Sequence, residues 1–399
     1  MKKVFTLAAG ALLAAGSLNA QAQIAVDGVL TAAEIGAANT GKYVLLGKFT
    51  NPRGFGDWGL MSLYAANTGS KIYFFVAGTV QNNAGGSNSL QLFIDLPGVT
   101  GASASPVPLP APVGTGTSFA GMVAKMDIAP DFGLAVKGNG SGVGGAAGTI
   151  VPQAVSYASA TVAADRDLAP ELPNSGAATT IATTSTTGAF ARLAGARMAY
   201  KNTPTGDITT NPANTTPNTG ATYGAVGSYG WEIELDRTAL GVVATNPAIG
   251  VFVLQNNGGG DYLSSDFIPQ TPNPLTTNNG NLTNANTVDF ATITGTQRAV
   301  FNVVALGTKA ADEASVAMSV YPNPAEGSAT VAYNVVGRSE KVNIVLTDLL
   351  GRQVQVLENS IKSTGVQSTK ANTANVGAGT YLVRVQVGDR VAVRKVVLL

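Results

Sequence analysis

The sequence predicts an all-β protein: a large, jelly-roll-like β-sandwich with long loops, followed by a small, immunoglobulin-like β-sandwich. Short runs of β-branched and aromatic residues recur along the chain between clusters of Gly, Asn and Pro, which is the pattern of strands and turns. Helical periodicity is scarce. Hydrophobic residues make up 45% of the 399 residues, so there is enough apolar material for two cores. Many strands joined by turns are typical of sandwiches and barrels.

Composition excludes several classes of function. The 24 basic and 23 acidic residues give a net charge of +1, so the chain lacks the basic stripe that a nucleic-acid partner would require. It contains no His and no Cys. This excludes disulfides, a Ser-His-Asp triad, a Cys-His pair and a lipid-anchored N-terminal Cys, together with the usual ligands of zinc, copper and haem.

The first 22 residues are predicted to be a signal peptide read by the Sec export machinery. Lys2 and Lys3 are followed by an apolar stretch over residues 4–15, which is shorter than the roughly 20 residues that span a bilayer. Ala20 and Ala22 form an A-x-A cleavage site, and we place the cut after Ala22. The exported chain is expected to be soluble.

Residues 23–306 are predicted to form the large sandwich. One predicted strand alternates Trp231, Ile233 and Leu235 with two glutamates, so we expect one dry face and one wet face. Short helical turns are expected at residues 31–35 and 236–240. The predicted strands are Lys71–Ala77, Leu90–Asp95, Trp231–Leu235, Gly250–Leu254 and Ala299–Val303.

Long segments of Gly, Ala, Thr, Asn and Pro separate these strands. Such segments bury little apolar surface and cannot offset the entropy lost on ordering them, so we expect exposed loops. They cover residues 101–118, 138–148, 177–187, 202–222 and 270–287.

A change of composition at residues 307–315 indicates a linker, and residues 316–399 form the second predicted unit. The predicted strands of this unit are Ala329–Asn334, Lys341–Asp348, Gln353–Glu358, Gly379–Val387 and Arg390–Leu398. Without disulfides, the unit depends on its Val and Leu core.

Four motifs in this unit can be interpreted from their residues. Prolines stiffen the entry to the unit, where we expect Tyr321 to pack beneath the strands. Gly351 allows a tight turn with positive φ. Tyr381 begins an alternation of apolar residues on one strand face. The motifs are Tyr321-Pro322-Asn323-Pro324, Asp348-Leu349-Leu350-Gly351-Arg352, Gly379-Thr380-Tyr381 and the terminal run from Lys395.

The order and spacing of these motifs resemble the type A sorting domain of type IX secretion cargo in Bacteroidetes-like bacteria. The resemblance implies a β-sandwich recognised as a whole surface by an outer-membrane translocon and a sorting peptidase. It further implies that the body is secreted, either released outside the cell or attached to the outer surface through lipopolysaccharide.

The body resembles the family 9 carbohydrate-binding modules and DOMON-like sandwiches. The matching pieces are Val26–Leu30 with Ala33-Glu34, Lys71–Ala77, Leu92–Asp95 and Gly230–Leu240. This resemblance implies binding of a glycan or another extracellular matrix component. The two-Trp clamp associated with family 9 modules is not identifiable.

Aromatic residues in Gly-rich loops are the candidates for a sugar platform. Trp58 lies in R-G-F-G-D-W-G, and we expect it to be exposed; Tyr262 and Asp261 follow N-N-G-G-G. Sugar-binding sites combine aromatic rings with polar side chains around the hydroxyls. Trp231 is assigned to the core instead.

Paired carboxylates are the remaining candidates for chemistry. Asp165 and Asp167, and Asp261 with Asp266, lie in predicted loops where a structural calcium ion would suit a sandwich, although none matches a known calcium loop. No other cofactor is expected.

Glu232 and Glu234 share a strand face about 7 Å apart at Cα, which would allow glycoside hydrolysis but also describes a wet sheet face. We therefore favour a non-enzymatic binding module. The alternatives are a structural or adhesive surface protein without a discrete ligand site and, less favoured, a carboxylate-based glycosidase.

Overall fold

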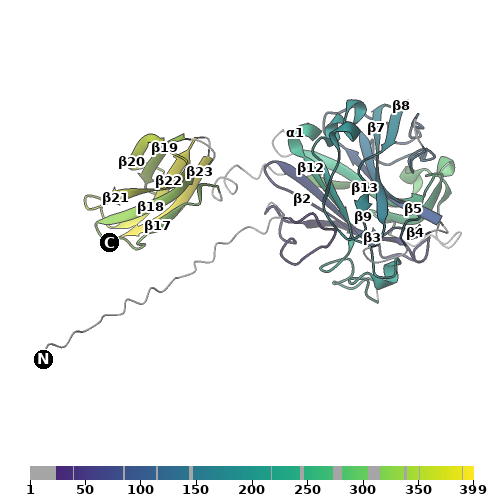
Figure 1. The fold of residues 1–399 in the computed structure, drawn as a ribbon, viewed down its shortest axis with the longest axis horizontal. Coiled ribbons are helices and arrows are strands. Elements are labelled where there is room, and N and C mark those ends of the chain that lie inside the picture. Colours follow the sequence, from purple (N-terminus) through teal and green to yellow (C-terminus); the bar gives the residue numbers. More distant parts are fainter. Residues whose placement is uncertain are drawn as a thin grey trace.

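The computed structural model describes residues 24–38, 40–83, 86–113, 116–142, 147–216, 218–242, 247–272, 281–303, 315–336, 339–349, 351–388 and 390–399. The predicted signal peptide with Ala20 and Ala22, and the predicted linker at 307–315 except its last residue, lie outside these ranges. The described residues form two all-β units, as the sequence predicts (Figure 1).

Two antiparallel sheets make up the body. The first has six strands in the order β1-β2-β3-β12-β11-β10. Their bounds are Val44–Lys48 (β1), Gly59–Asn67 (β2), Lys71–Thr79 (β3), Gly230–Asp236 (β12), Arg197–Tyr200 (β11) and Thr179–Thr180 (β10).

The second sheet has ten strands, with a main path β15-β14-β13-β5-β6-β7-β8 and three short strands paired to its members. The main strands are Thr283–Asn284 (β15), Tyr262–Ile268 (β14), Ala248–Asn257 (β13), Gly86–Asp95 (β5), Phe132–Gly138 (β6), Thr149–Ser159 (β7) and Val162–Asp167 (β8). The short ones are Ala299–Asn302 (β16, on β13), Asn82–Asn83 (β4, on β5) and Leu172–Pro173 (β9, on β7).

The main core lies between the two sheets. Phe74 and Trp231 from the six-stranded sheet share one cluster of buried side chains with Leu92 and Val251 from the ten-stranded sheet. Trp231 is fully buried, as predicted. All five predicted body strands are present, most of them a few residues longer than expected.

The outer faces of both sheets are also covered, and this corrects the expectation of exposed loops. Residues of the 101–118 segment, including Leu109, pack with Phe93 and Phe252 on the outer face of the ten-stranded sheet. Ile208, from the 202–222 segment, packs with Phe75 on the outer face of the six-stranded sheet. Strands buried on both faces explain why the sequence shows nearly continuous apolar runs there.

Helical elements are short. α1 (Arg237–Leu240) begins at Asp236, whose side chain accepts from the backbone N–H groups of Thr238 and Ala239, and it ends at Gly241 in the left-handed conformation. The predicted turn at 236–240 is confirmed. The 3-10 helices are Thr183–Ser185 (η1), Gly188–Leu193 (η2), Ile208–Thr210 (η3), Ala285–Thr287 (η5) and Phe290–Thr292 (η6). None of the helices in the described part of the chain is long and apolar enough to cross a membrane.

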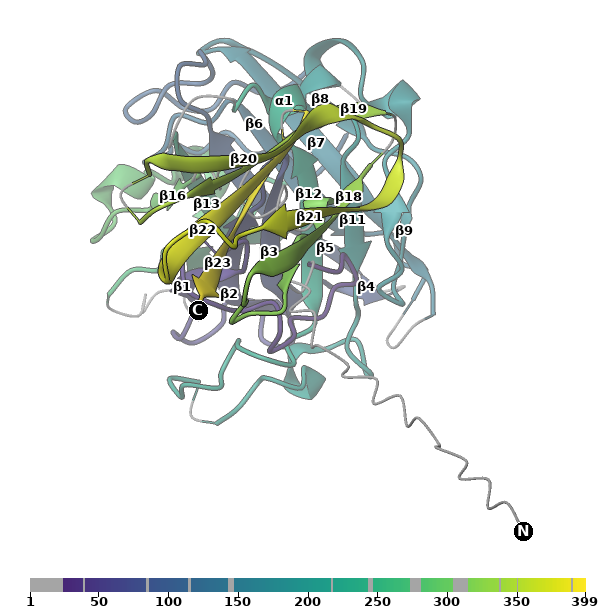
Figure 2. The ribbon, with the colours of Figure 1, turned by 90° about the vertical axis from the view of Figure 1, so that its left-hand side faces the viewer.

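The C-terminal unit is a smaller sandwich of a three-stranded and a four-stranded sheet (Figure 2). Val331 and Tyr333 from the first sheet pack against Ile344 and Val385 from the second. The first sheet contains Ser319–Tyr321 (β17), Ser328–Val335 (β18) and Gly365–Asn372 (β21); the second contains Gln353–Lys362 (β20), Glu340–Thr347 (β19), Gly379–Val387 (β22) and Arg390–Leu398 (β23).

Candidate functional site

One end of the body sandwich holds a cleft of about 370 Å³ where three connections between strands meet. The β1–β2 loop contributes Phe55 and Trp58, and the start of β14 contributes Tyr262. The polar lining comes from the segment between β3 and β4, from the start of β5 and from the end of β13: Gln81, Ser87, Asn88 and Asn257. The structure thus brings the two predicted aromatic residues, Trp58 and Tyr262, to one cleft.

Phe55 is the aromatic lining residue that sequence reasoning missed, and the four polar lining residues were missed as well. Its ring stacks on that of Tyr262, with ring centroids 6.2 Å apart and planes inclined by 18°. Phe55, Trp58 and Tyr262 are all half-buried, so Trp58 is less exposed than expected. The signal that could have found Phe55 is its place three residues before Trp58 in the same Gly-rich loop. Asp261 does not line the cleft; it accepts a hydrogen bond from Asn257 Nδ2 at 2.7 Å.

A buried carboxylate anchors the β1–β2 loop, which carries Phe55 and Trp58 and is called the aromatic loop from here on. Asp266, in β14, accepts from the backbone N–H of Gly54 at 2.9 Å and from that of Leu60 at 3.3 Å, and Ser264 Oγ donates to it at 3.0 Å. Burial raises the pKa of Asp266 to about 6, against the opposing effect of the Gly54 hydrogen bond. Asp266 was predicted as a loop carboxylate for calcium; it is instead a buried strand residue that anchors a loop.

The 202–222 segment and Tyr223 hold the same loop from the side. Arg53 donates to the Tyr223 hydroxyl at 2.6 Å and to Asn214 Oδ1 at 3.2 Å. Trp58 Nε1 donates to the carbonyl of Gly206 at 3.0 Å. Because both ends of the loop are fixed, its aromatic rings are positioned before any ligand arrives.

Asn88 forms a buried polar point in the wall of the cleft. Its side chain is on β5, opposite Asn257 on β13, and the residue is 2% exposed. Oδ1 accepts from the backbone N–H of Gln81 at 2.6 Å. Among the residues that the structure describes, Nδ2 has no hydrogen-bond partner. A backbone N–H can only donate, so this contact assigns the oxygen of the amide and leaves Nδ2 as a spare donor.

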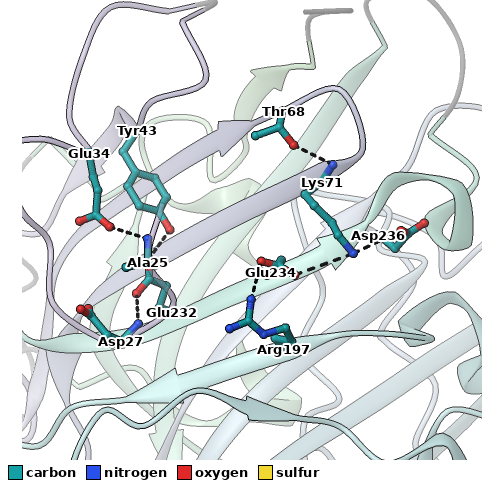
Figure 3. A network of polar contacts seen from close by, with 10 residues as sticks. All are labelled: Ala25, Asp27, Glu34, Tyr43, Thr68, Lys71, Arg197, Glu232, Glu234 and Asp236. Carbon is teal, nitrogen blue, oxygen red and sulfur yellow. Dashed lines mark hydrogen bonds and ion pairs between the residues drawn. The ribbon is translucent and has the colours of Figure 1, made fainter. Parts of the chain in front are cut away.

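The face of β12 that was predicted to be wet is covered, and the reason is a contact distant in sequence (Figure 3). Glu232 is 0% exposed. It accepts from Tyr43 Oη at 2.7 Å and from the backbone N–H groups of Asp27 and Gly28 at 2.9 Å each. The N-terminal segment therefore closes over this face. Burial raises the pKa of Glu232 to about 8, although these hydrogen bonds oppose the shift.

Glu234 is also enclosed, at 5% exposure, and it is part of an ion-pair cluster. Arg197 lies 3.1 Å from one of its oxygens, and Lys71 lies 3.8 Å from the other while also pairing with Asp236 at 3.3 Å (Figure 3). Neither Glu232 nor Glu234 lines the cleft. Both carboxylates interact with protein partners.

Asp165 and Asp167 lie in strand β8 and not in the loop where they were expected. The Thr117 hydroxyl donates to Asp165, which is 6% exposed, and Gln153 Nε2 donates to Asp167 at 2.7 Å. Across the described ranges, no group of three or more acidic side chains could hold a metal ion.

The motifs of the C-terminal unit form internal contacts. Asn323 Nδ2 donates to the carbonyl of Lys395 at 3.0 Å, and Asn323 Oδ1 accepts from the N–H of Val397 at 2.9 Å. The 321–324 motif is thus tied to the last strand, in which Lys395 is an exposed residue. The stiff entry was expected to place Tyr321 beneath the strands, but Tyr321 is 53% exposed at the end of β17.

Two further motif predictions are confirmed. Gly351 has φ of 82°, within a turn in which Arg352 Nε donates to Asp348 Oδ2 at 2.7 Å. Tyr381 starts the alternating face of β22, and its hydroxyl donates to the carbonyl of Gly377 at 2.9 Å. Gly379 and Thr380 begin the same strand.

Comparison with known families identifies the C-terminal unit. Residues 319–399 match the family described as the secretion system C-terminal sorting domain. The chain thus carries the sorting tail of type IX secretion, and it is an exported protein that is attached to the cell surface or released. The tail implies an interaction with the type IX machinery. The resemblance of the body to family 9 modules has no support from these comparisons.

Comparison with individual proteins adds little about the body. No curated protein matches the chain. Among solved structures, dimeric latent PorU from Porphyromonas gingivalis is 13% identical, with 82% of this chain aligned to 31% of that one and a TM-score of 0.19. PorZ from the same bacterium, a surface component of the type IX secretion system, is 14% identical, with 69% aligned to 38% and a TM-score of 0.17. This chain thus spans about a third of the length of the structures it matches.

Proposed function

We propose that the body is a non-catalytic glycan-binding module that the C-terminal unit delivers to the cell exterior. The observation that carries the proposal is the cleft, in which three half-buried rings, Phe55, Trp58 and Tyr262, lie beside amide side chains. Sugar rings have apolar faces that pack on aromatic rings, while their hydroxyls need hydrogen-bonding partners around the edge. The cleft supplies both kinds of group.

The size of the cleft supports a short segment of glycan. Its volume of about 370 Å³ is near the lower end of the roughly 300–1,000 Å³ that small-molecule sites occupy. One or two sugar rings would fit. The anchors of the aromatic loop, Asp266 and Arg53, reduce the entropy that binding would otherwise cost.

A glycan array followed by isothermal titration calorimetry tests the proposal, using the chain from residue 23 to 399. We expect binding of at least one oligosaccharide, and about tenfold weaker binding by Tyr262→Ala, because a stacking ring is lost. Tyr321→Ala is the matched control, since it removes an exposed tyrosine outside the cleft.

Two results would contradict the proposal. Absence of binding at millimolar sugar would favour a structural or adhesive role without a discrete site. Equal loss of affinity in Tyr262→Ala and Tyr321→Ala would show that sugar binds elsewhere.

A further inference from the structure

We infer that the ligand of the cleft is an electrically neutral glycan and that Asn88 selects it by donating a hydrogen bond from Nδ2 to a sugar oxygen. This inference rests on the proposed function and narrows it to one ligand class. It follows from two independent features of the cleft: the absence of charge in its lining and the unpartnered amide in its wall.

None of the seven residues that line the cleft carries a charge. The charged residues next to the aromatic rings in the chain, Asp57 and Asp261, are both acidic and exposed. An anionic sugar would lose hydration on entering the cleft and would find no cation among the residues that line it. Uronic acids and phosphorylated sugars are therefore disfavoured.

Two basic residues lie near the cleft but do not line it. Arg53 belongs to the aromatic loop, but its guanidinium donates to Tyr223 and Asn214. Lys137 approaches Gly258, and its ammonium group lies 3.5 Å from the carbonyl oxygen of Gly116. Neither side chain is part of the lining. The cleft thus lacks the bidentate or ammonium donors that anion sites use.

The amide side chains around the cleft differ in whether their N–H donors already have a hydrogen-bond partner. Asn257 Nδ2 is committed to Asp261 at 2.7 Å. Asn88 Nδ2 has no partner in the described part of the chain, and a buried donor without a partner is destabilising. A sugar hydroxyl or carbonyl oxygen that accepts from Asn88 would remove this penalty on binding. A ligand that lacks an acceptor at that position would leave the penalty in place. Asn88 therefore favours ligands that carry an acceptor oxygen there over ligands that do not.

The test compares neutral oligosaccharides with uronic-acid and phosphorylated oligosaccharides of the same length, by titration calorimetry on the chain from residue 23 to 399. We expect the neutral ligands to bind at least about tenfold more tightly. Asn88→Asp keeps the shape and the contact with Gln81 but removes the donor, and we expect about tenfold weaker binding of neutral ligands.

Asn202→Asp is the matched control. Asn202 is 1% exposed, accepts from the N–H of Thr203 at 2.9 Å, has an unpartnered Nδ2 and does not line the cleft. We expect it to bind as the unmodified chain does. Should Asn88→Asp fail to fold, the salt dependence of the unmodified chain still tests the ligand class, since binding of a neutral ligand is nearly independent of ionic strength.

The outcomes separate the two proposals. If no glycan binds, the proposed function fails. If acidic glycans bind as tightly as neutral ones, or if affinity falls steeply with salt, the proposed function stands and the inference of a neutral ligand is overturned. If Asn88→Asp binds neutral glycans as tightly as Asn202→Asp does, the role of Asn88 is overturned.

Discussion

Replacing Glu232 by Gln should remove a specific pH dependence from the stability of the body. The carboxyl is fully buried, and its pKa is raised from an ordinary value of 4.5 to about 8. Between these two values the folded state binds more protons than the unfolded state, so the free energy of unfolding falls as pH rises. The stability that Glu232 contributes is fully present below pH 4.5 and is lost as pH rises through 8.

The size of the effect follows from the same values. Between pH 6 and 8, Glu232 is ionised in the unfolded chain but mostly protonated in the folded one. At about 1.36 kcal/mol per proton and pH unit, the loss over this window is roughly 2 kcal/mol. Gln preserves the local contacts: its carbonyl oxygen can accept from the N–H groups of Asp27 and Gly28, and its amide can donate to the Tyr43 oxygen.

Urea unfolding at pH 6, 7 and 8, followed by tryptophan fluorescence, measures this effect. Both tryptophans of the chain, Trp58 and Trp231, are in the body, so the signal reports the body alone. The raised pKa values of Asp131 and Asp266, both about 6, add their own pH dependence, but they are common to both proteins and cancel in the difference. Glu234→Gln, on the same strand face, is the control. If Glu232→Gln and the unmodified chain lost stability equally between pH 6 and 8, the reasoning would be refuted.

Two further predictions concern the loop anchor and the processed chain. Asp266→Ala leaves the N–H groups of Gly54 and Leu60 without their acceptor, so we expect thermal unfolding to report a loss of about 2–3 kcal/mol. Ser264→Ala, which keeps both contacts, should cost less than about 1 kcal/mol; equal losses would contradict the assignment. Mass spectrometry of surface and medium fractions should show a body that starts at Gln23 and ends within residues 307–315, and intact full-length chain outside the cell would argue against cleavage.

Ten of the strands were predicted, because their signal is local, whereas several body strands, among them β2, β6, β7 and β14, were not predicted. Runs such as 71–77 and 379–387 contain the β-branched and aromatic alternation that a strand requires, and each is a strand in the structure. β21 was missed because it is a polar edge strand whose Val366 is 84% exposed, so it lacks an apolar face to detect. β17 was missed because it has only three residues.

The covered outer faces could not be predicted from local patterns. The segments that cover them place single apolar residues, such as Leu109 and Ile208, at irregular spacing within Gly-, Thr- and Asn-rich stretches. Glu232 has the local pattern of a wet face, and only the N-terminal segment, about 200 residues away in sequence, turns it into a buried group. Short-range periodicity carries no information about such contacts.

The candidate cleft was predictable in part. Gly-rich loops with an aromatic residue pointed to Trp58 and Tyr262, because loops position binding residues on a rigid scaffold. Asn88 was out of reach, since one asparagine among many becomes notable only when its buried, unpartnered amide is seen. The loop positions expected for Asp165, Asp167 and Asp266 were wrong, since all three are in strands, where each accepts at least one hydrogen bond from a neighbouring group.

The central claim is that the C-terminal unit directs export across the outer membrane and that the body does not. Cell fractionation of a strain that produces only residues 1–306 tests this claim most directly. We expect this shortened chain to cross the inner membrane, fold and stay in the periplasm, whereas the full chain reaches the surface or the medium. Shortened chain appearing outside intact cells at the level of the full chain would contradict it.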